Sequence, residues 1–190
     1  MGLAKLKPYL SIEEYLSGEN DGAIRHEYIY GEVYAMASAS DRHNQICGNF
    51  FVKLFPKFNG SKNCQVFMTD MKLQADEATF YYPDVFVACD KPDPYFRREP
   101  ILIVEVLSSS TENTDRREKL KVYLQIPSLE EYAIAAQDEM RVEIYRKKSD
   151  ETWQKQILTE AEEVLELKSV ELNAALAEIY QGVDFAESLS

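Results

Sequence analysis

Glu105 is the one acid in an apolar run, residues 101–107, that reads Ile-Leu-Ile-Val-Glu-Val-Leu. Runs of this length and composition are typical of strands that are covered on both faces. An ionised carboxylate buried there costs several kcal/mol unless a metal ion or another cation compensates its charge. Asp84 is likewise the one acid in the apolar run 81–89, and Lys119 follows in a helical segment. Two strand acids with a lysine nearby predict a metal-dependent phosphodiester hydrolase.

Asp84 and Glu105 are the candidate metal ligands. Hydrolysis of a phosphodiester requires stabilisation of charge on the phosphate and an activated water, and divalent ions held by carboxylates supply both. Mg²⁺ prefers oxygen ligands and keeps several waters, so two or three acids on neighbouring strands are enough to bind it. We therefore expect the strands of Asp84 and Glu105 to be neighbours. A buried salt bridge from each acid to an arginine or lysine is the alternative.

Lys119 could stabilise the charge that develops on the phosphate, or it could position the attacking water. Its spacing from Asp115 and Tyr123 is i, i+4 and i+8, which places the three along one face of a helix. A surface ion pair between Asp115 and Lys119, worth a few tenths of a kcal/mol, is the alternative. Lys121 and Lys72 are rival candidates for the catalytic lysine.

Glu27 could add a further ligand to the metal or to a water, although an acid in such a strand-like segment is more often solvated. Of the two histidines, His43 lies near the start of an expected helix, where we expect a packing or capping role. No Ser–His–Asp or Cys–His spacing supports a hydrolase triad. The chain also lacks a GxGxxG or Walker-type loop, which disfavours enzymes that use nucleotide cofactors.

The apolar periodicity predicts alternating helices and strands that would position these residues. Expected helices cover about residues 11–17, 41–58, 111–125 and 173–180. Expected strands cover about 64–74, 80–89, 100–107, 130–136, 141–147 and 152–158, after a hairpin over 25–37. This order predicts an α/β fold with a mixed central β-sheet flanked by helices.

Composition indicates one ordered globular domain over residues 1–190. No apolar stretch reaches the roughly 18 residues that cross a bilayer, and no secretory signal begins the chain, so we expect a cytoplasmic protein without a membrane partner. Three cysteines, odd in number and widely spaced, argue against a disulfide framework or a zinc site. The net charge of −12 argues against strong non-specific binding of nucleic acid, although basic residues can still line a cleft.

Several segments together resemble the Uma-two family, restriction-endonuclease-like proteins of the PD-(D/E)XK nuclease superfamily that were long a domain of unknown function. The resemblance covers about residues 10–182. The segments that carry it are residues 25–33, 82–85, 103–108 with Ser110 and Thr111, the helical set Asp115, Lys119 and Tyr123, and residues 126–132. Each motif is weak alone, but their order along the chain is specific.

The resemblance implies that Asp84 is the Asp of the superfamily motif, that Glu105 is its Asp/Glu, and that Glu27 is its leading acid. The usual lysine lies two positions after the second acid, where this chain has Leu107. The resemblance implies that Lys119, on the following helix, takes over that role. It also implies a mixed sheet flanked by helices, dependence on Mg²⁺ (or Mn²⁺), DNA as the substrate and a homodimer, for which a two-fold axis is the commonest arrangement.

Three interpretations therefore stand, of which hydrolysis of some other phosphoester is the weakest. The first is a Mg²⁺-dependent endonuclease with Asp84, Glu105 and Lys119 at its centre and Glu27 in support. The second is a dimeric interaction or regulatory module, catalytically weak or inactive, that keeps the nuclease fold. Retention of the candidate polar groups favours the first, whereas the acidic net charge and Leu107 favour the second.

Overall fold

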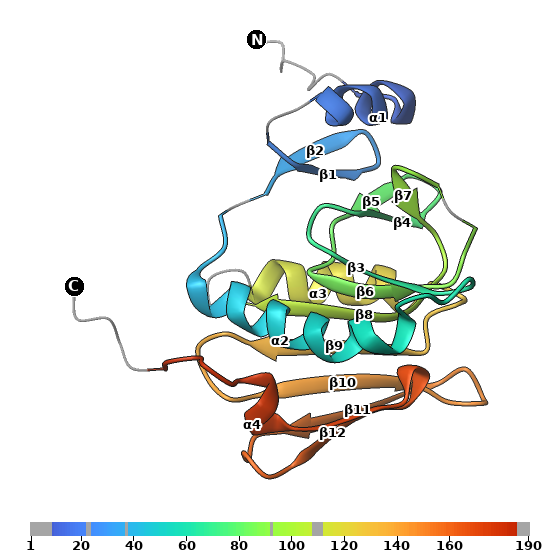
Figure 1. The fold of residues 1–190 in the computed structure, drawn as a ribbon. Coiled ribbons are helices and arrows are strands. Elements are labelled where there is room, and N and C mark those ends of the chain that lie inside the picture. Colours follow the sequence, from blue (N-terminus) through green and yellow to red (C-terminus); the bar gives the residue numbers. More distant parts are fainter. Residues whose placement is uncertain (1–8, 22–23, 37, 92, 108–111, 186–190) are drawn as a thin grey trace, which may run out of the picture.

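A computed structural model describes residues 9–21, 24–36, 38–91, 93–107 and 112–185 (Figure 1). In chain order, its helices and strands are α1 (Ile12–Asp21), β1 (His26–Ile29), β2 (Glu32–Ala35), α2 (Asp41–Phe58), β3 (Gln65–Met68), β4 (Lys72–Asp76), β5 (Thr79–Tyr81), β6 (Val85–Ala88), β7 (Phe96–Arg97), β8 (Pro100–Leu107), α3 (Glu112–Tyr123), β9 (Glu131–Ala136), β10 (Val142–Lys147), β11 (Trp153–Leu158), β12 (Val164–Leu167), the 3₁₀ turn η1 (Lys168–Val170), β13 (Leu172–Ala175) and α4 (Leu176–Ile179).

Two larger sheets organise the described residues. The six-stranded sheet has the order β11-β10-β9-β8-β6-β3, and the five-stranded sheet has the order β2-β1-β5-β4-β7. The strand pairs β8–β9 and β4–β7 are parallel, and every other strand pair in these two sheets is antiparallel. Both sheets are therefore mixed. The five-stranded sheet lies with α1 at the N-terminal end of the molecule (Figure 1). The expected α/β class with a mixed sheet is confirmed.

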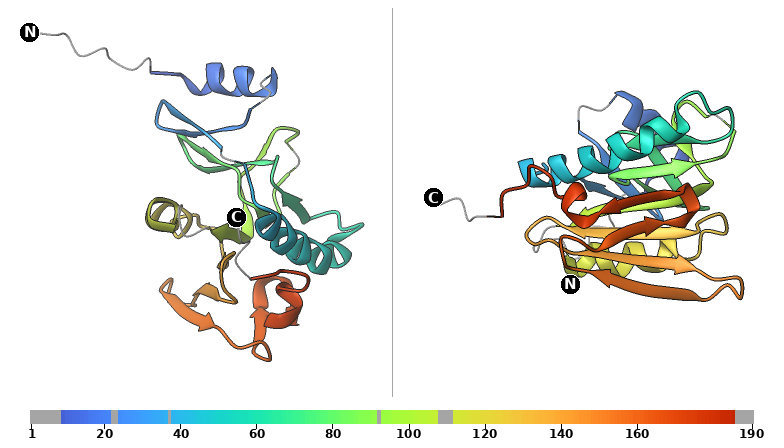
Figure 2. Two further views of the ribbon diagram at one scale, coloured as in Figure 1. Left: turned by 90° about the vertical axis from the view of Figure 1, so that its left-hand side faces the viewer. Right: turned by 60° about the horizontal axis from the view of Figure 1, so that its bottom comes forward.

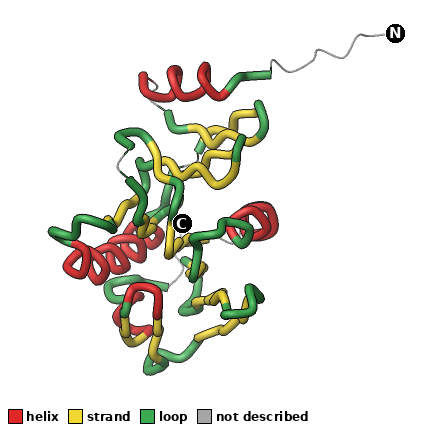
Figure 3. The backbone as a smooth tube through the Cα atoms, turned by 90° about the vertical axis from the view of Figure 1, so that its right-hand side faces the viewer, coloured by secondary structure: helices red, strands yellow, loops and turns green. Residues whose placement is uncertain are grey.

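Helices α2 and α3 lie on opposite sides of the six-stranded sheet. This arrangement is visible in two views from opposite directions (Figures 2 and 3). Successive residues of a strand point to opposite faces, so β6 and β8 supply apolar side chains to both helices. On the α2 side Phe50 packs in one cluster with Val85 and Val104. On the α3 side Tyr123 packs in another with Ile103. No helix in the described ranges is both long and apolar enough to cross a membrane.

Two expected strands are each divided between the sheets. The expected strand 64–74 becomes β3 and β4, because the chain turns at Thr69, which has a positive φ of 46°. The expected strand 80–89 becomes β5 and β6, which belong to different sheets. Pro83 lies at this crossing, where the missing N–H of proline cannot take part in a strand ladder. Asp84 therefore directly precedes β6 instead of lying within it.

The C-terminal region also differs from expectation. In place of a helix over 173–180, the chain forms the hairpin β12–β13 and then the single turn α4. The alternation of exposed Val164 and Glu166 with buried Leu165 and Leu167 has the two-residue period of a strand. The buried leucines join the α2-side cluster, so this hairpin extends the core beneath α2.

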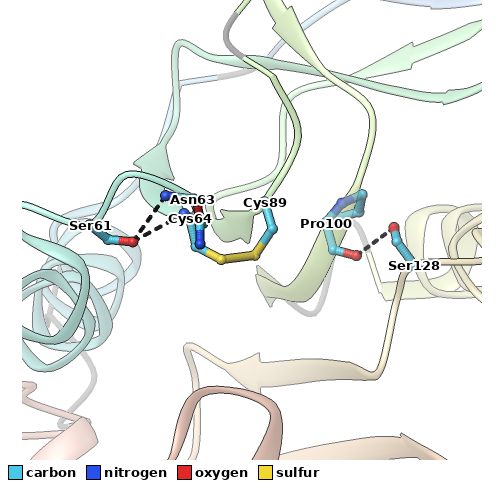
Figure 4. The surroundings of a disulfide bond; sticks show 6 residues. All are labelled: Ser61, Asn63, Cys64, Cys89, Pro100 and Ser128. Atoms are coloured by element: carbon cyan, nitrogen blue, oxygen red, sulfur yellow. Dashed lines mark hydrogen bonds between the residues drawn. A yellow bond between two sulfur atoms is a disulfide. The ribbon is translucent and has the colours of Figure 1, made fainter.

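Cys64 and Cys89 form a disulfide, which corrects the expectation from cysteine spacing (Figure 4). The strands β3 and β6 are antiparallel, with Gln65 opposite Ala88, and each cysteine is one residue beyond that pair. The strand register therefore brings together two cysteines 25 positions apart. The third cysteine, Cys47, is free and buried in α2.

Candidate active site

Glu105 lies on β8 and points toward α3. Its side chain is 3% exposed, and its Oε1 atom accepts hydrogen bonds from the Tyr123 hydroxyl at 2.9 Å and from the Lys119 ammonium at 3.4 Å. Lys119 and Tyr123 are four residues apart on α3, which places both on the helix face that covers β8. The expected helix face is thus directed at the acid, and Glu105 has both a cation and a neutral donor.

Lys119 also binds Glu27, which comes from β1 of the other sheet. The Lys119 Nζ atom is 2.8 Å from Oε1 of Glu27, and the ammonium lies 5.3 Å from the ring centroid of Tyr81. The same Glu27 oxygen accepts a hydrogen bond from the backbone N–H of Tyr82 at 3.4 Å. A single buried ammonium therefore bridges carboxylates from the two sheets. The side chain of Asp115, the alternative partner of Lys119, lies outside the described residues.

The rival lysines are placed elsewhere. Lys121 is on α3 but its side chain is exposed. Lys72 is buried, yet it lies over the ring of Tyr82, 5.6 Å from the centroid, and lines a cavity of about 230 Å³ with Glu19 and Arg25. Of the three candidates, Lys119 is the lysine that contacts the predicted acids.

Asp84 contacts β8 and the helix α2, whereas Glu105 contacts α3. Its Oδ2 atom accepts a hydrogen bond from the Val106 backbone N–H at 2.7 Å, and its Oδ1 atom is 2.9 Å from Nε2 of His43 on α2. The antiparallel register of β6 and β8 pairs Val85 with Val104, which places Asp84 alongside Glu105. The expectation that the strands of the two acids are neighbours is confirmed. The expectation of one strand over 80–89 that contains Asp84 is wrong at this point, because β5 ends at Tyr81 and β6 begins at Val85.

His43 is the residue of this region whose contact the sequence did not reveal. Its backbone N–H does take part in the expected cap, donating to the Ser40 hydroxyl at 3.1 Å. Its ring, however, reaches across to Asp84. The sequence signal was only a histidine one turn before the buried Cys47, and a helix position alone does not identify a partner on a distant strand.

The pKa of Glu105 is raised to about 8, chiefly because burial disfavours the charged form. The nearby charges of Asp84 and Glu27 raise it further, whereas Lys119 and the hydroxyl of Tyr123 lower it. The distances agree with this balance, because Lys119 lies closer to Glu27 than to Glu105. Without another cation, Glu105 therefore holds a proton more readily than an ordinary glutamate.

The pKa of His43 is raised despite burial of its ring. Burial alone lowers the pKa of an imidazole, but the hydrogen bond to Asp84 and the charge of that carboxylate outweigh it. The protonated imidazole is thus favoured next to Asp84. A donating Nε2–H group fixes one oxygen of Asp84 while the Val106 N–H fixes the other.

The donors gathered at this point suit a hard divalent cation. Asp84, Glu105 and Glu27 offer carboxylate oxygens, the ligand type that Mg²⁺ and Mn²⁺ prefer. Mutual repulsion among them contributes to the raised pKa of Glu105, and a bound cation would relieve that repulsion. Asp84 and Glu105, which lie opposite each other in the register of the two strands, are therefore the candidate ligands of such an ion. The arrangement also places one ammonium, that of Lys119, at the same site.

Comparisons with known proteins give a consistent result. Residues 12–177 match the profile of the Uma2 family, described as "Putative restriction endonuclease". Over 183 residues the chain is 36% identical to the uncharacterized protein slr1290 of Synechocystis sp., a match that covers 94% of this chain and 95% of that protein. The uncharacterized protein sll1609 of the same organism is 36% identical over 157 residues, 80% of this chain and 86% of that protein.

A solved structure shares the fold. It is the crystal structure of "a putative nuclease belonging to DUF820" from Anabaena variabilis, with a TM-score of 0.68 over 87% of this chain and 96% of that one. The two sequences are 14% identical, so this likeness concerns the fold alone.

Proposed function

Because the chain belongs to the Uma2 family, we propose that it is a Mg²⁺-dependent endonuclease that hydrolyses phosphodiester bonds of DNA, with Mn²⁺ able to replace Mg²⁺. One observation carries this proposal. The ammonium of Lys119 on α3 lies between Glu27 and Glu105, with Asp84 alongside. A cation between two carboxylates, with a third acid at the neighbouring strand position, supplies the kinds of group that phosphodiester hydrolysis requires.

Lys119 supports the proposal because it supplies the lysine that the superfamily motif has at the position of Leu107. The side chain of Leu107 is buried in the apolar cluster on the α3 side of the sheet, in company with Tyr123. A lysine from α3 reaches Glu105 from that same side, so the charge missing at position 107 is supplied from the helix. A long and flexible lysine side chain makes such a change of origin physically reasonable.

Each residue then has a role. Asp84 and Glu105 would hold the Mg²⁺, which when bound polarises the phosphate and lowers the pKa of a bound water. Lys119 stabilises the negative charge that builds on the phosphate in the transition state. Glu27 orients Lys119 through the 2.8 Å contact, and it is the remaining acid that could accept a proton from the attacking water. His43 positions Asp84.

The proposed substrate and assembly follow from the same chemistry. With a net charge of −12, the chain must attract DNA through local basic groups and the bound cation, and cleavage should weaken as salt rises. Cutting both strands of a duplex needs two centres, which a two-fold homodimer would supply.

A cleavage assay tests the proposal. Supercoiled and linear DNA are incubated with Mg²⁺ or Mn²⁺ and the wild type, Asp84→Asn, Lys119→Met or Lys121→Met, after circular dichroism has shown that each protein is folded. We expect cleavage by the wild type and by the Lys121→Met control, and its loss in the other two variants. Cleavage that survives Lys119→Met would refute the role of this lysine. A folded wild type that cuts neither DNA with either metal would favour the interaction module instead.

A further inference from the structure

A second set of metal donors meets at Asp84, on the α2 side of the sheet. Nitrogen of His43, sulfur of Cys47 and a carboxylate oxygen of Asp84 all lie within 4.8 Å of one another. His43 and Cys47 are four residues apart on α2, the spacing at which two helix residues share a face and can hold one metal ion. These donors therefore converge on a point that the endonuclease proposal does not use, apart from Asp84.

The surroundings of Cys47 indicate that its thiol faces the acids. The side chain is 1% exposed, and the pKa of the thiol is raised by burial and then by the negative charges of Asp84 and Glu105. Since Cys64 and Cys89 are joined in the disulfide, Cys47 is the only free thiol among the three cysteines of the chain. Cys47 also packs in the apolar cluster on the α2 side, so the imidazole and the carboxylate beside its thiol are additional to that packing role.

We propose that His43, Cys47 and Asp84 form a Zn²⁺ site, and that Zn²⁺ bound there excludes Mg²⁺ from Asp84. Zinc accepts nitrogen, sulfur and oxygen ligands together, commonly three from the protein and one water. Mg²⁺ prefers oxygen ligands, so the thiol selects for zinc over magnesium. As the ion binds, the thiol proton of Cys47 and the proton that His43 directs at Asp84 are both released to solvent.

The spacing of the donors suits this ion. Ligand atoms of a tetrahedral zinc site lie roughly 3.3–3.6 Å apart, given Zn–N and Zn–S distances near 2.0 and 2.3 Å. Nε2 of His43 and Oδ1 of Asp84 are 2.9 Å apart, and the widest separation in the group is within 4.8 Å. Binding therefore requires the widest pair of donors to approach each other and the His43–Asp84 pair to separate slightly.

One oxygen of Asp84, Oδ2, already accepts a hydrogen bond from the Val106 N–H, which leaves Oδ1 as the oxygen for which zinc and Mg²⁺ compete. Because the two ions compete for one carboxylate, zinc would inhibit the Mg²⁺-dependent reaction. The degree of inhibition would depend on the free Zn²⁺ concentration. This consequence rests on the proposed function, in which Asp84 holds the Mg²⁺. The zinc site itself does not depend on that function.

Co²⁺ is the spectroscopic probe for this site, because a Co²⁺–thiolate bond gives intense charge-transfer absorption that nitrogen and oxygen ligands do not. The intact protein is titrated with Co²⁺ without oxygen or reductant, so that the disulfide stays closed and Cys47 is the thiol available. We expect the absorption band to saturate at a single Co²⁺ per chain and to disappear when Zn²⁺ is added. The band should be lost in Cys47→Ala and in His43→Gln, and kept in Asn44→Ala, an exposed control position on α2.

Competition is measured separately by the paramagnetic resonance signal of Mn²⁺, with no DNA present. Zn²⁺ is expected to release bound Mn²⁺ from the wild type but not from Cys47→Ala. A folded wild type without the charge-transfer band, or a band that persists in both site variants, would overturn the zinc site. Retention of Mn²⁺ by the zinc-loaded wild type would overturn the exclusion. Failure of the DNA cleavage assay alone would leave both optical and resonance results standing, so the two proposals are separable.

Discussion

Replacing Lys119 with methionine is the perturbation whose effect follows most directly from the structure. The change removes the ammonium that lies 2.8 Å from Glu27 and 3.4 Å from Glu105, while methionine keeps most of the apolar stem. Coulomb attraction amounts to roughly 6 kcal/mol for the ionised Glu27 with an effective dielectric constant of about 20, and to less for Glu105, because this carboxyl is largely protonated at pH 7. Desolvation offsets much of that attraction, so the measured loss must be smaller than the sum.

Removal of one partner from a buried ion pair usually lowers stability by about 3–5 kcal/mol, because the other charge is left buried and unpaired. Glu105 can take up a proton, since its pKa already lies near 8, and this limits the loss. We therefore expect Lys119→Met to reduce the free energy of unfolding by about 3 kcal/mol at pH 7. The measurement is urea unfolding followed by circular dichroism, with a chelator present so that no metal replaces the lost cation.

Lys121→Met is the matched control, because it makes the same change on the same helix at an exposed side chain. We expect it to alter the free energy of unfolding by no more than about 0.5 kcal/mol. The double variant Lys119→Met/Glu27→Gln should recover part of the lost stability, since Glu27 is the carboxylate that loses its nearest cation. A loss below about 1 kcal/mol for Lys119→Met, or one equal to that of the control, would refute the buried ion cluster.

Three further predictions concern protonation and the disulfide. The pKa of Glu105 is about 8 in the folded chain against an ordinary 4.5, so between these pH values the native state binds a proton that the unfolded chain does not. The stability that this proton contributes is lost as the pH rises from about 4.5 to 8. In metal-free urea unfolding, Glu105→Gln should flatten this decline with pH, and an unchanged slope would refute the raised pKa. The ring pKa of His43, followed by NMR, should lie above 6.5 and fall in Asp84→Asn; an equal value in both proteins would argue against their hydrogen bond. Because Cys64 and Cys89 are paired, the denatured protein should show one reactive thiol before reduction and three after it, and three thiols at the outset would contradict the disulfide. Reduction of the disulfide should lower the free energy of unfolding by about 3 kcal/mol.

Local patterns in the sequence were sufficient for much of the fold. The apolar repeat of Ile46, Phe50 and Leu54 defines α2, whose bounds match the prediction, and the run around Glu105 forms β8. The pairing of β6 with β8 was expected from the acids of the two apolar runs, and it holds although β7, which lies between them in the chain, belongs to the other sheet. Lys119 lies at the acids because four-residue spacing fixes one helix face.

Other features depend on contacts between distant segments. Nothing in the residues at Thr69 marks the turn that separates β3 from β4, and the change of sheet at Pro83 is set by packing. Cross-strand register joins Cys64 to Cys89, and register is not readable from cysteine spacing. The ring of His43 reaches Asp84 only because α2 packs over β6, so the sequence indicated a cap and not this contact.

Anomalous diffraction at the manganese edge, from crystals grown with Mn²⁺, would test the central proposal most directly. We expect one strong peak contacted by carboxylate oxygens of Asp84 and Glu105, with the ammonium of Lys119 beside it. A peak bound elsewhere on the folded protein, or no peak at saturating Mn²⁺, would contradict the metal-dependent centre.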